Sequence, residues 1–267
     1  MSTRFESATA VQPQGNGLYT AAIADGWDIM GNANGGYLIA LAASAMRHAA
    51  GRKDPLSITA HYLAPAPAGD VEIHTEVVKS GRRVATVASS LRRGDKEFIR
   101  VLGSFGTLQT DSALQHVTAT PPDLPPFDEC ILREPSTGTF VPPIFDKANI
   151  RLHPDDAKFT MESGSGVAQM RGWFQFSDTA SCDSLGLLFV ADSFPPTFFN
   201  LFGVKGWVPT LEYTVHVRAQ PVEGPLRCVF TTRALQGGFM EEDGEMWDES
   251  GTLVAMSRQL ALVPLGQ

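Results

Sequence analysis

One aspartate of this chain stands out because its neighbours are almost all apolar. Asp192 is the only carboxylate in the run SLGLLFVADSF at positions 184–194, which has the composition of a buried helix. Burial disfavours the charged form of a carboxyl group and raises its pKa. An aspartate held in this way can orient a water molecule and accept its proton. The other interpretation is that Asp192 only ends the helix before Pro195, and these residues alone favour neither.

The glycine pair Gly35-Gly36 is the second feature that could do chemistry. It opens the apolar run YLIALAASAMRHAA at positions 37–50. Glycines let the N–H groups of a helix N-terminus approach a ligand closely, and the helix dipole favours negative charge there. The N–H of Gly36 or Tyr37 is therefore a candidate donor to an oxyanion. Equally, the glycines could only let the helix start tightly against a sheet, and Asn34 could orient a substrate or, more commonly, cap the helix.

The elements that must position these residues repeat along the chain. Each apolar helix is accompanied by strand-like runs, rich in β-branched and aromatic residues and separated by turn signals. The runs are 57–67, 71–80, 83–93 and 97–108 in the first half, and 149–154, 166–176, 210–221, 226–236, 244–250 and 252–263 in the second. Shared pattern and turn placement predict an α+β protein made of two copies of one unit, an antiparallel sheet wrapped around a long apolar helix. Two unrelated α+β domains are the alternative.

A proline-rich segment separates the two halves. Its prolines are Pro121, Pro122, Pro125, Pro126, Pro142 and Pro143. Repeated proline disfavours regular helix and interior strand, so this segment is expected to be a linker. The predicted organisation is an N-terminal unit at 1–110, a linker at 111–147 and a C-terminal unit at 148–267.

Composition excludes several classes of protein. The 267 residues are 43% hydrophobic, which excludes wholesale disorder, and the net charge of -8 argues against a general nucleic-acid binder. Cys130, Cys182 and Cys228 form no CxxC pair, and the six histidines show no metal-type spacing. The first residues lack the apolar core of a signal peptide, and no apolar run is long enough to span a bilayer. We therefore expect a cytoplasmic protein with no cofactor, no bound metal and no membrane insertion.

Several segments, taken in order and spacing, resemble the thioesterase-like superfamily, and in particular the double-hotdog proteins similar to acyl-CoA thioesterase II. In the first half they are NGGYLIALAASAM and HYLAPAPAG, and in the second CDSLGLLFVADSFPP, PTLEYTVHV and GTLVAMSRQLAL. The resemblance implies a hotdog fold in each half, with the two sheets joined into one. It also implies hydrolysis of acyl-CoA thioesters, a role in lipid metabolism. The sequence contains no GxSxG motif, which argues against an α/β-hydrolase.

The resemblance also implies a set of site residues. In that family an Asp at the end of the second long helix, a Thr or Ser on the next strand and a Gln on the last strand hold the attacking water. The matching residues here are Asp192, Thr210 and Gln259. Hydrogen bonds from Thr210 and Gln259 would favour the charged form of Asp192. Taken alone, each of these two could be an ordinary strand residue.

The first half lacks this trio. An ungapped alignment of the halves places Ser44, Leu56 and Ser104 opposite Asp192, Thr210 and Gln259. A duplicated fold that keeps one site while the other drifts would show this pattern.

The sequence says less about the residues that would contact the substrate. Phe194 and Phe198 follow Asp192 closely and could line an acyl pocket, although such aromatic residues more often form plain core or a subunit interface.

Exposed sheet edges and the apolar helix end predict a homodimer or higher homo-oligomer. Two other functions stay open: a non-catalytic module that binds acyl-CoA or acyl-carrier protein, and a hotdog enzyme of different chemistry such as a hydratase.

Overall fold

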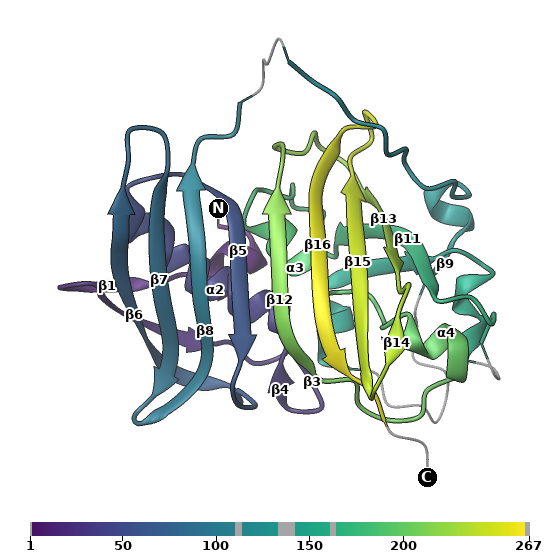
Figure 1. The fold of residues 1–267 in the computed structure, drawn as a ribbon, viewed down its shortest axis with the longest axis horizontal. Coiled ribbons are helices and arrows are strands. Elements are labelled where there is room, and N and C mark those ends of the chain that lie inside the picture. The colour runs from purple at the N-terminus through teal and green to yellow at the C-terminus, as the bar shows by residue number, and fades with distance from the viewer. Residues whose placement is uncertain (1, 110–113, 133–141, 161–163, 265–267) are drawn as a thin grey trace.

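The chain folds around one large antiparallel sheet. The structure, a computed structural model, describes residues 2–109, 114–132, 142–160 and 164–264. From the outer edge to the middle, the first half contributes β1 (Gln12–Gly15), β2 (Leu18–Ile23), β6 (Gly69–Ser80), β7 (Ala85–Arg93), β8 (Lys96–Gly106) and β5 (Asp54–Tyr62). From the middle outward, the second half contributes β12 (Thr210–Val217), β16 (Leu253–Leu262), β15 (Phe239–Trp247), β13 (Leu226–Thr231), β11 (Gln169–Phe176), β10 (Ala148–Leu152) and β9 (Ile131–Leu132). Figure 1 shows these strands side by side, with β14 (Leu235–Gln236) paired to β15. A separate hairpin joins β3 (Asp28–Ile29) and β4 (Asn32–Ala33).

The two halves of the sheet meet at β5 and β12. These strands pair in antiparallel register with Ala60 opposite Tyr213, and the hydroxyl oxygens of Thr59 and Thr214 lie 2.9 Å apart. Backbone hydrogen bonds therefore run across the junction without a break. Residues of the two halves can share one continuous inner face.

Both halves use the same strand order. In the first half the strands lie in the order β2-β6-β7-β8-β5, and in the second in the order β11-β13-β15-β16-β12. In each half the strand that precedes the helix lies toward the outer edge, and the strand that follows the helix lies at the junction. The repeated pattern of the sequence corresponds to a repeated topology.

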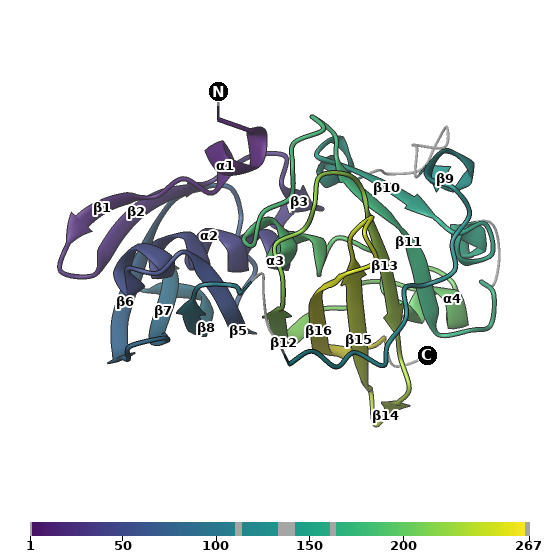
Figure 2. The same cartoon turned by 90° about the horizontal axis from the view of Figure 1, so that it is seen from above.

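The predicted first helix is present with its predicted caps. α2 spans Gly35–Ala50, the Asn34 side chain accepts a hydrogen bond from the Tyr37 N–H at 2.9 Å, and Gly51 ends the helix in the left-handed region at φ 59°. Nearly all of α2 is buried, since it contacts β5, β6, β7 and β8 as well as the second helix. Figure 2 shows the sheet curving around it. Its all-round apolar sequence is explained by this position.

The prediction of a long second helix is wrong. α3 spans only Gly186–Val190, after which the N–H groups of Asp192 and Ser193 bond three residues back rather than four. The helical partner of the Ala191 carbonyl would be the N–H of residue 195, which is a proline and has none. The Tyr213 hydroxyl from β12 donates to that carbonyl instead. The run 184–194 is apolar because it is buried, but it is helical only in part.

The remaining elements are short. They are α1 (Arg4–Ala8), α4 (Phe198–Phe202) and three 3-10 helices at Phe127–Glu129, Pro143–Asp146 and Asp156–Thr160. Two of these 3-10 helices and the edge strand β9 lie within the predicted linker, whose prolines therefore allow short elements. Strand β2 was not predicted, because LYTAAI is short and alternates only weakly.

Two further observations concern the whole described chain. Cys130, Cys182 and Cys228 are buried and unpaired. Within the described ranges, no helix has both the length and the apolar character needed to cross a membrane.

The close packing of α2 on α3 predicts the effect of one substitution. A side-chain carbon at Gly36 would lie 2.6 Å from the Leu188 carbonyl oxygen and 2.9 Å from Asp192 Cβ. Gly36→Ala should therefore lower the free energy of unfolding by about 1–3 kcal/mol, as overpacking does. Urea denaturation measures this change, with His48→Ala, an exposed position in the last turn of the same helix, as the control. A Gly36→Ala protein as stable as the control would contradict the packing argument.

Candidate active site

Asp192 lies directly against the start of α2. Its Oδ2 accepts hydrogen bonds from the Gly36 N–H at 2.9 Å and from Asn34 Nδ2 at 3.1 Å. Asn34 Nδ2 also lies 2.7 Å from the Asp192 backbone oxygen. Asn34 thus caps α2 with its oxygen and holds Asp192 with its nitrogen, so that one side chain joins the two halves of the chain.

The environment of Asp192 suits a proton acceptor. Burial raises the pKa of Asp192 to about 6, while hydrogen bonds from the Gly36 and Gly35 N–H groups and from Asn34 act in the opposite direction. The carboxylate is mostly ionised at neutral pH but is a stronger base than an exposed aspartate. A base with a pKa close to the working pH is effective in proton transfer.

The two backbone N–H groups expected to donate to an oxyanion donate to side chains of the protein instead. The Gly36 N–H donates to Asp192, and the Tyr37 N–H donates to Asn34 Oδ1. In this structure both N–H groups expected as oxyanion donors are bonded to acceptors of the protein itself. The helix N-terminus does attract negative charge, but the charge is the protein's own carboxylate. The glycine pair is required for close packing, since a side-chain carbon at Gly35 would lie 2.8 Å from Asp192 Oδ2.

Thr210 and Gln259 form a pair of their own. Thr210 begins β12, Gln259 lies on the inner face of β16, and the Gln259 amide nitrogen donates to the Thr210 hydroxyl. Within the described residues, no hydrogen bond joins either of them to Asp192, which differs from the expectation. The pair is nevertheless close to the Asp192 segment, because Gln259 lies opposite Tyr213 in the sheet and Tyr213 donates to the carbonyl of Ala191.

Glu242 is a functional candidate that the sequence analysis missed. It lies on β15 directly opposite Gln259, is 7% exposed, and accepts a hydrogen bond from the Thr197 N–H at 2.8 Å. Burial and, to a smaller extent, the charge of Asp192 raise its pKa to about 7. The signal in the sequence was an acidic residue at an inward position of an alternating strand, between Met240 and Gly244. The predicted strand began at 244 and therefore excluded it.

The two phenylalanines proposed for an acyl pocket pack against other side chains. The Phe194 ring centroid lies 5.1 Å from that of Phe230. Phe198 is buried in a small apolar cluster with Val208 and Met240. This packing corresponds to the alternative interpretation, in which the two rings belong to the core.

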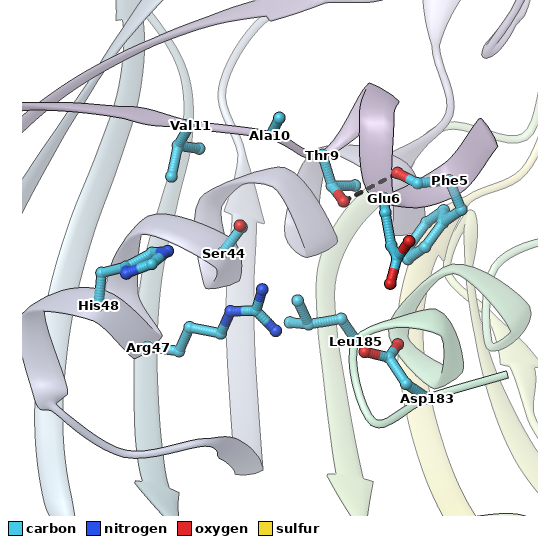
Figure 3. A pocket seen from close by; sticks show the side chains of 10 residues that line it. All are labelled: Phe5, Glu6, Thr9, Ala10, Val11, Ser44, Arg47, His48, Asp183 and Leu185. Carbon is cyan, nitrogen blue, oxygen red and sulfur yellow. Dashed lines mark hydrogen bonds between the residues drawn. The ribbon is translucent and has the colours of Figure 1, made fainter. Parts of the chain in front are cut away.

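A cavity of about 280 Å³ lies at the other end of α2, away from Gly36. Figure 3 shows Ser44, Arg47 and His48 of α2 around it, with Asp183 and Leu185 from the segment before α3. Ser44 is the residue that the alignment of the halves places opposite Asp192. This cavity therefore presents a hydroxyl at the position where the second half has its carboxylate.

In the described ranges, no group of three or more His, Cys, Asp or Glu side chains is arranged to hold a metal ion.

Because Glu242 is buried, we predict that replacing its carboxylate raises the stability of the protein, and that the gain depends on pH. The folded-state pKa of about 7 exceeds the ordinary glutamate value of 4.5, so the folded state loses stability as the pH rises from 4.5 to 7. Glu242→Gln should raise the free energy of unfolding by about 3 kcal/mol at pH 8 and by little below pH 4.5. The size follows from the pKa shift of Glu242, since each pKa unit corresponds to about 1.4 kcal/mol. Denaturant titrations across this pH range test it. Glu241→Gln, on the opposite face of β15, is the control. Equal pH dependence in the Glu242→Gln and wild-type proteins would contradict this account.

Comparison with known proteins extends over nearly the whole chain. It is 27% identical to a Mycobacterium tuberculosis protein of unassigned function over 99% of both chains. It is similar to a solved structure from Thermobifida fusca, provisionally named thioesterase II, with 30% identity, a TM-score of 0.87 and 98% of both chains covered. A protein with a hotdog fold from Alicyclobacillus acidocaldarius matches over 100% of both chains with a TM-score of 0.88 and 21% identity. The last similarity concerns the fold alone.

Family models match both halves. The acyl-CoA thioesterase N-terminal domain matches residues 23–106, and the acyl-CoA thioesterase C-terminal domain matches residues 120–263. The sequence resemblance is thereby confirmed, and this hotdog-fold chain belongs to the acyl-CoA thioesterase family.

Proposed function

We propose that this protein hydrolyses an acyl-CoA thioester to the free acid and CoA by direct attack of an activated water. The observation that carries the proposal is the carboxylate of Asp192, which is held by Asn34 and Gly36 and has a pKa of about 6. Membership of the acyl-CoA thioesterase family supports the choice of reaction.

In this proposal each residue of the trio has a separate role. Asp192 accepts the proton of the water as the water oxygen bonds to the thioester carbon. Thr210 fixes the orientation of the Gln259 amide, whose oxygen then remains available to the water or the substrate. Collapse of the tetrahedral intermediate breaks the carbon–sulfur bond, and the departing CoA sulfur takes up the proton that Asp192 accepted. No cofactor takes part in this scheme.

We further propose that the chain is a double hotdog with a single active site. The repeated strand order of the two halves supports units at 1–110 and 148–267 joined by the segment 111–147. The presence of the trio in one half only supports a single site. A cytoplasmic location is supported by the three buried unpaired cysteines. A homo-oligomer is supported by apolar side chains on the outer face of the sheet, such as Leu102 and Met256, which are 52% and 40% exposed.

Replacement of Asp192 tests the proposed reaction. Asp192→Asn keeps the shape of the side chain but cannot accept the proton, so kcat on the preferred acyl-CoA should fall by about 10²–10⁴-fold. The measurement is free-thiol release from a panel of short, medium and long acyl-CoAs.

The matched control is Asp183→Asn at the opposite end of α3. Asp183 accepts a hydrogen bond from the Gly186 N–H, a role that asparagine also fills, so turnover should stay near that of the wild type. Turnover that survives in Asp192→Asn would refute the site. Absence of turnover in the wild type would favour the binding module instead.

The raised pKa of Asp192 predicts how kcat/KM falls at low pH. Below about pH 6 the carboxyl group is protonated and cannot accept a proton, so kcat/KM should fall with an apparent pKa of about 6. A limb near pH 4 in the wild type would show that Asp192 is not the titrating base.

A further inference from the structure

The hydroxyl of Tyr62 is buried without a partner. Tyr62 is the last residue of β5, and its Oη is shielded from solvent but has no hydrogen-bond partner within the described part of the chain. The other central tyrosines differ, since the Tyr37 hydroxyl bonds to Ala8 and Ala24 and that of Tyr213 bonds to Ala191. Because an unpaired buried hydroxyl costs free energy, such a group marks a place where a ligand can supply the missing acceptor.

This hydroxyl lies beside Asp192. A side-chain carbon at Gly35 would be 2.6 Å from Tyr62 Oη and 2.8 Å from Asp192 Oδ2, so the two oxygens pack against the same side of Gly35. Both oxygens can approach this closely because residue 35 has no side chain. Burial and the charge of Asp192 both raise the pKa of Tyr62, so the phenol keeps its proton and can act as a donor.

The site needs a donor that the backbone does not supply. Hydrolysis of a thioester places negative charge on the carbonyl oxygen, which must be met by a preorganised hydrogen bond. The Gly36 and Tyr37 N–H groups are directed at Asp192 and Asn34. The hydroxyl of Tyr62 is next to the base and bonds to no acceptor among the described residues.

We propose that the Tyr62 hydroxyl donates a hydrogen bond to the carbonyl oxygen of the acyl thioester and stabilises the oxyanion. This inference rests on the proposed thioesterase activity and adds a catalytic residue from the first half of the chain. Water bonds to the carbonyl carbon as Asp192 takes its proton, and the carbonyl π electrons move to the oxygen held by Tyr62. The carbon–oxygen double bond then re-forms, the carbon–sulfur bond breaks, and the CoA sulfur receives the proton. Tyr62 keeps its own proton throughout.

Tyr62→Phe tests the proposal with the loss of one oxygen atom. On the acyl-CoA that the wild type turns over best, kcat should fall by about 100- to 1,000-fold, the range for one oxyanion donor, while KM changes by less than about threefold. The midpoint of thermal unfolding should stay the same or rise, because the hydroxyl makes no hydrogen bond in the free protein. The acidic limb of the pH profile should keep its shape, since Asp192 is still present.

Tyr19→Phe is the matched control, because this tyrosine lies on β2 beside the His48 ring and away from Asp192. Its turnover should remain within about twofold of the wild type. A binding measurement adds a second readout: an acyl-CoA analogue with a ketone in place of the thioester should bind the wild type more tightly than a thioether analogue without the carbonyl. Tyr62→Phe should abolish this difference.

The outcomes separate the two proposals. If Asp192→Asn loses turnover while Tyr62→Phe keeps kcat within threefold of the wild type, the role of Tyr62 is refuted and the thioesterase stands. A clear fall in the unfolding midpoint of Tyr62→Phe would also refute it, by assigning the hydroxyl a structural role. If the wild type hydrolyses no acyl-CoA of the panel, both proposals fail together.

Discussion

The hydrogen bonds between the Asp192 carboxylate and the start of α2 join the two halves of this protein at the place where its chemistry would occur. Asp192 comes from the second half, whereas Asn34 and Gly36 come from the first. The N-terminus of a helix favours a negative charge, and here that charge is a side chain of the same chain. One feature depends on this contact directly: residues 35 and 36 must be glycine, because a side-chain carbon at either position would lie under 3.0 Å from an atom of Asp192.

Electrostatics around this contact give the site its character. Asp192 and Glu242 are both removed from water and both have raised pKa values, about 6 and about 7. Burying two carboxylates is costly for folding, and proteins commonly keep such groups where function requires them. Hydrogen bonds from Gly36 to Asp192 and from Thr197 to Glu242 limit the cost. The arrangement therefore favours a base that works close to neutral pH.

The duplicated topology shows how one half can supply what the other half lacks. The sheet is continuous through β5 and β12, so the inner face carries Tyr62 from one half and Tyr213, Gln259 and Glu242 from the other. At the opposite end of α2, the cavity beside Arg47 has Ser44 where the second half has Asp192.

Local sequence determined most of the strands, the helix α2 with its Asn34 and Gly51 caps, and the singular position of Asp192. These features depend on alternation, capping chemistry and composition within a few residues, which a sequence displays directly. It also determined the family, through the order and spacing of its segments. Tertiary structure alone decided the partners of Asp192 and of the Ala191 carbonyl, the pairing of Gln259 with Thr210, and the burial of Glu242 and of the Tyr62 hydroxyl. Each of these depends on contacts between residues that are far apart in the chain, such as Tyr213 with Ala191 or Gly36 with Asp192. The residue pattern within a short segment does not show such contacts.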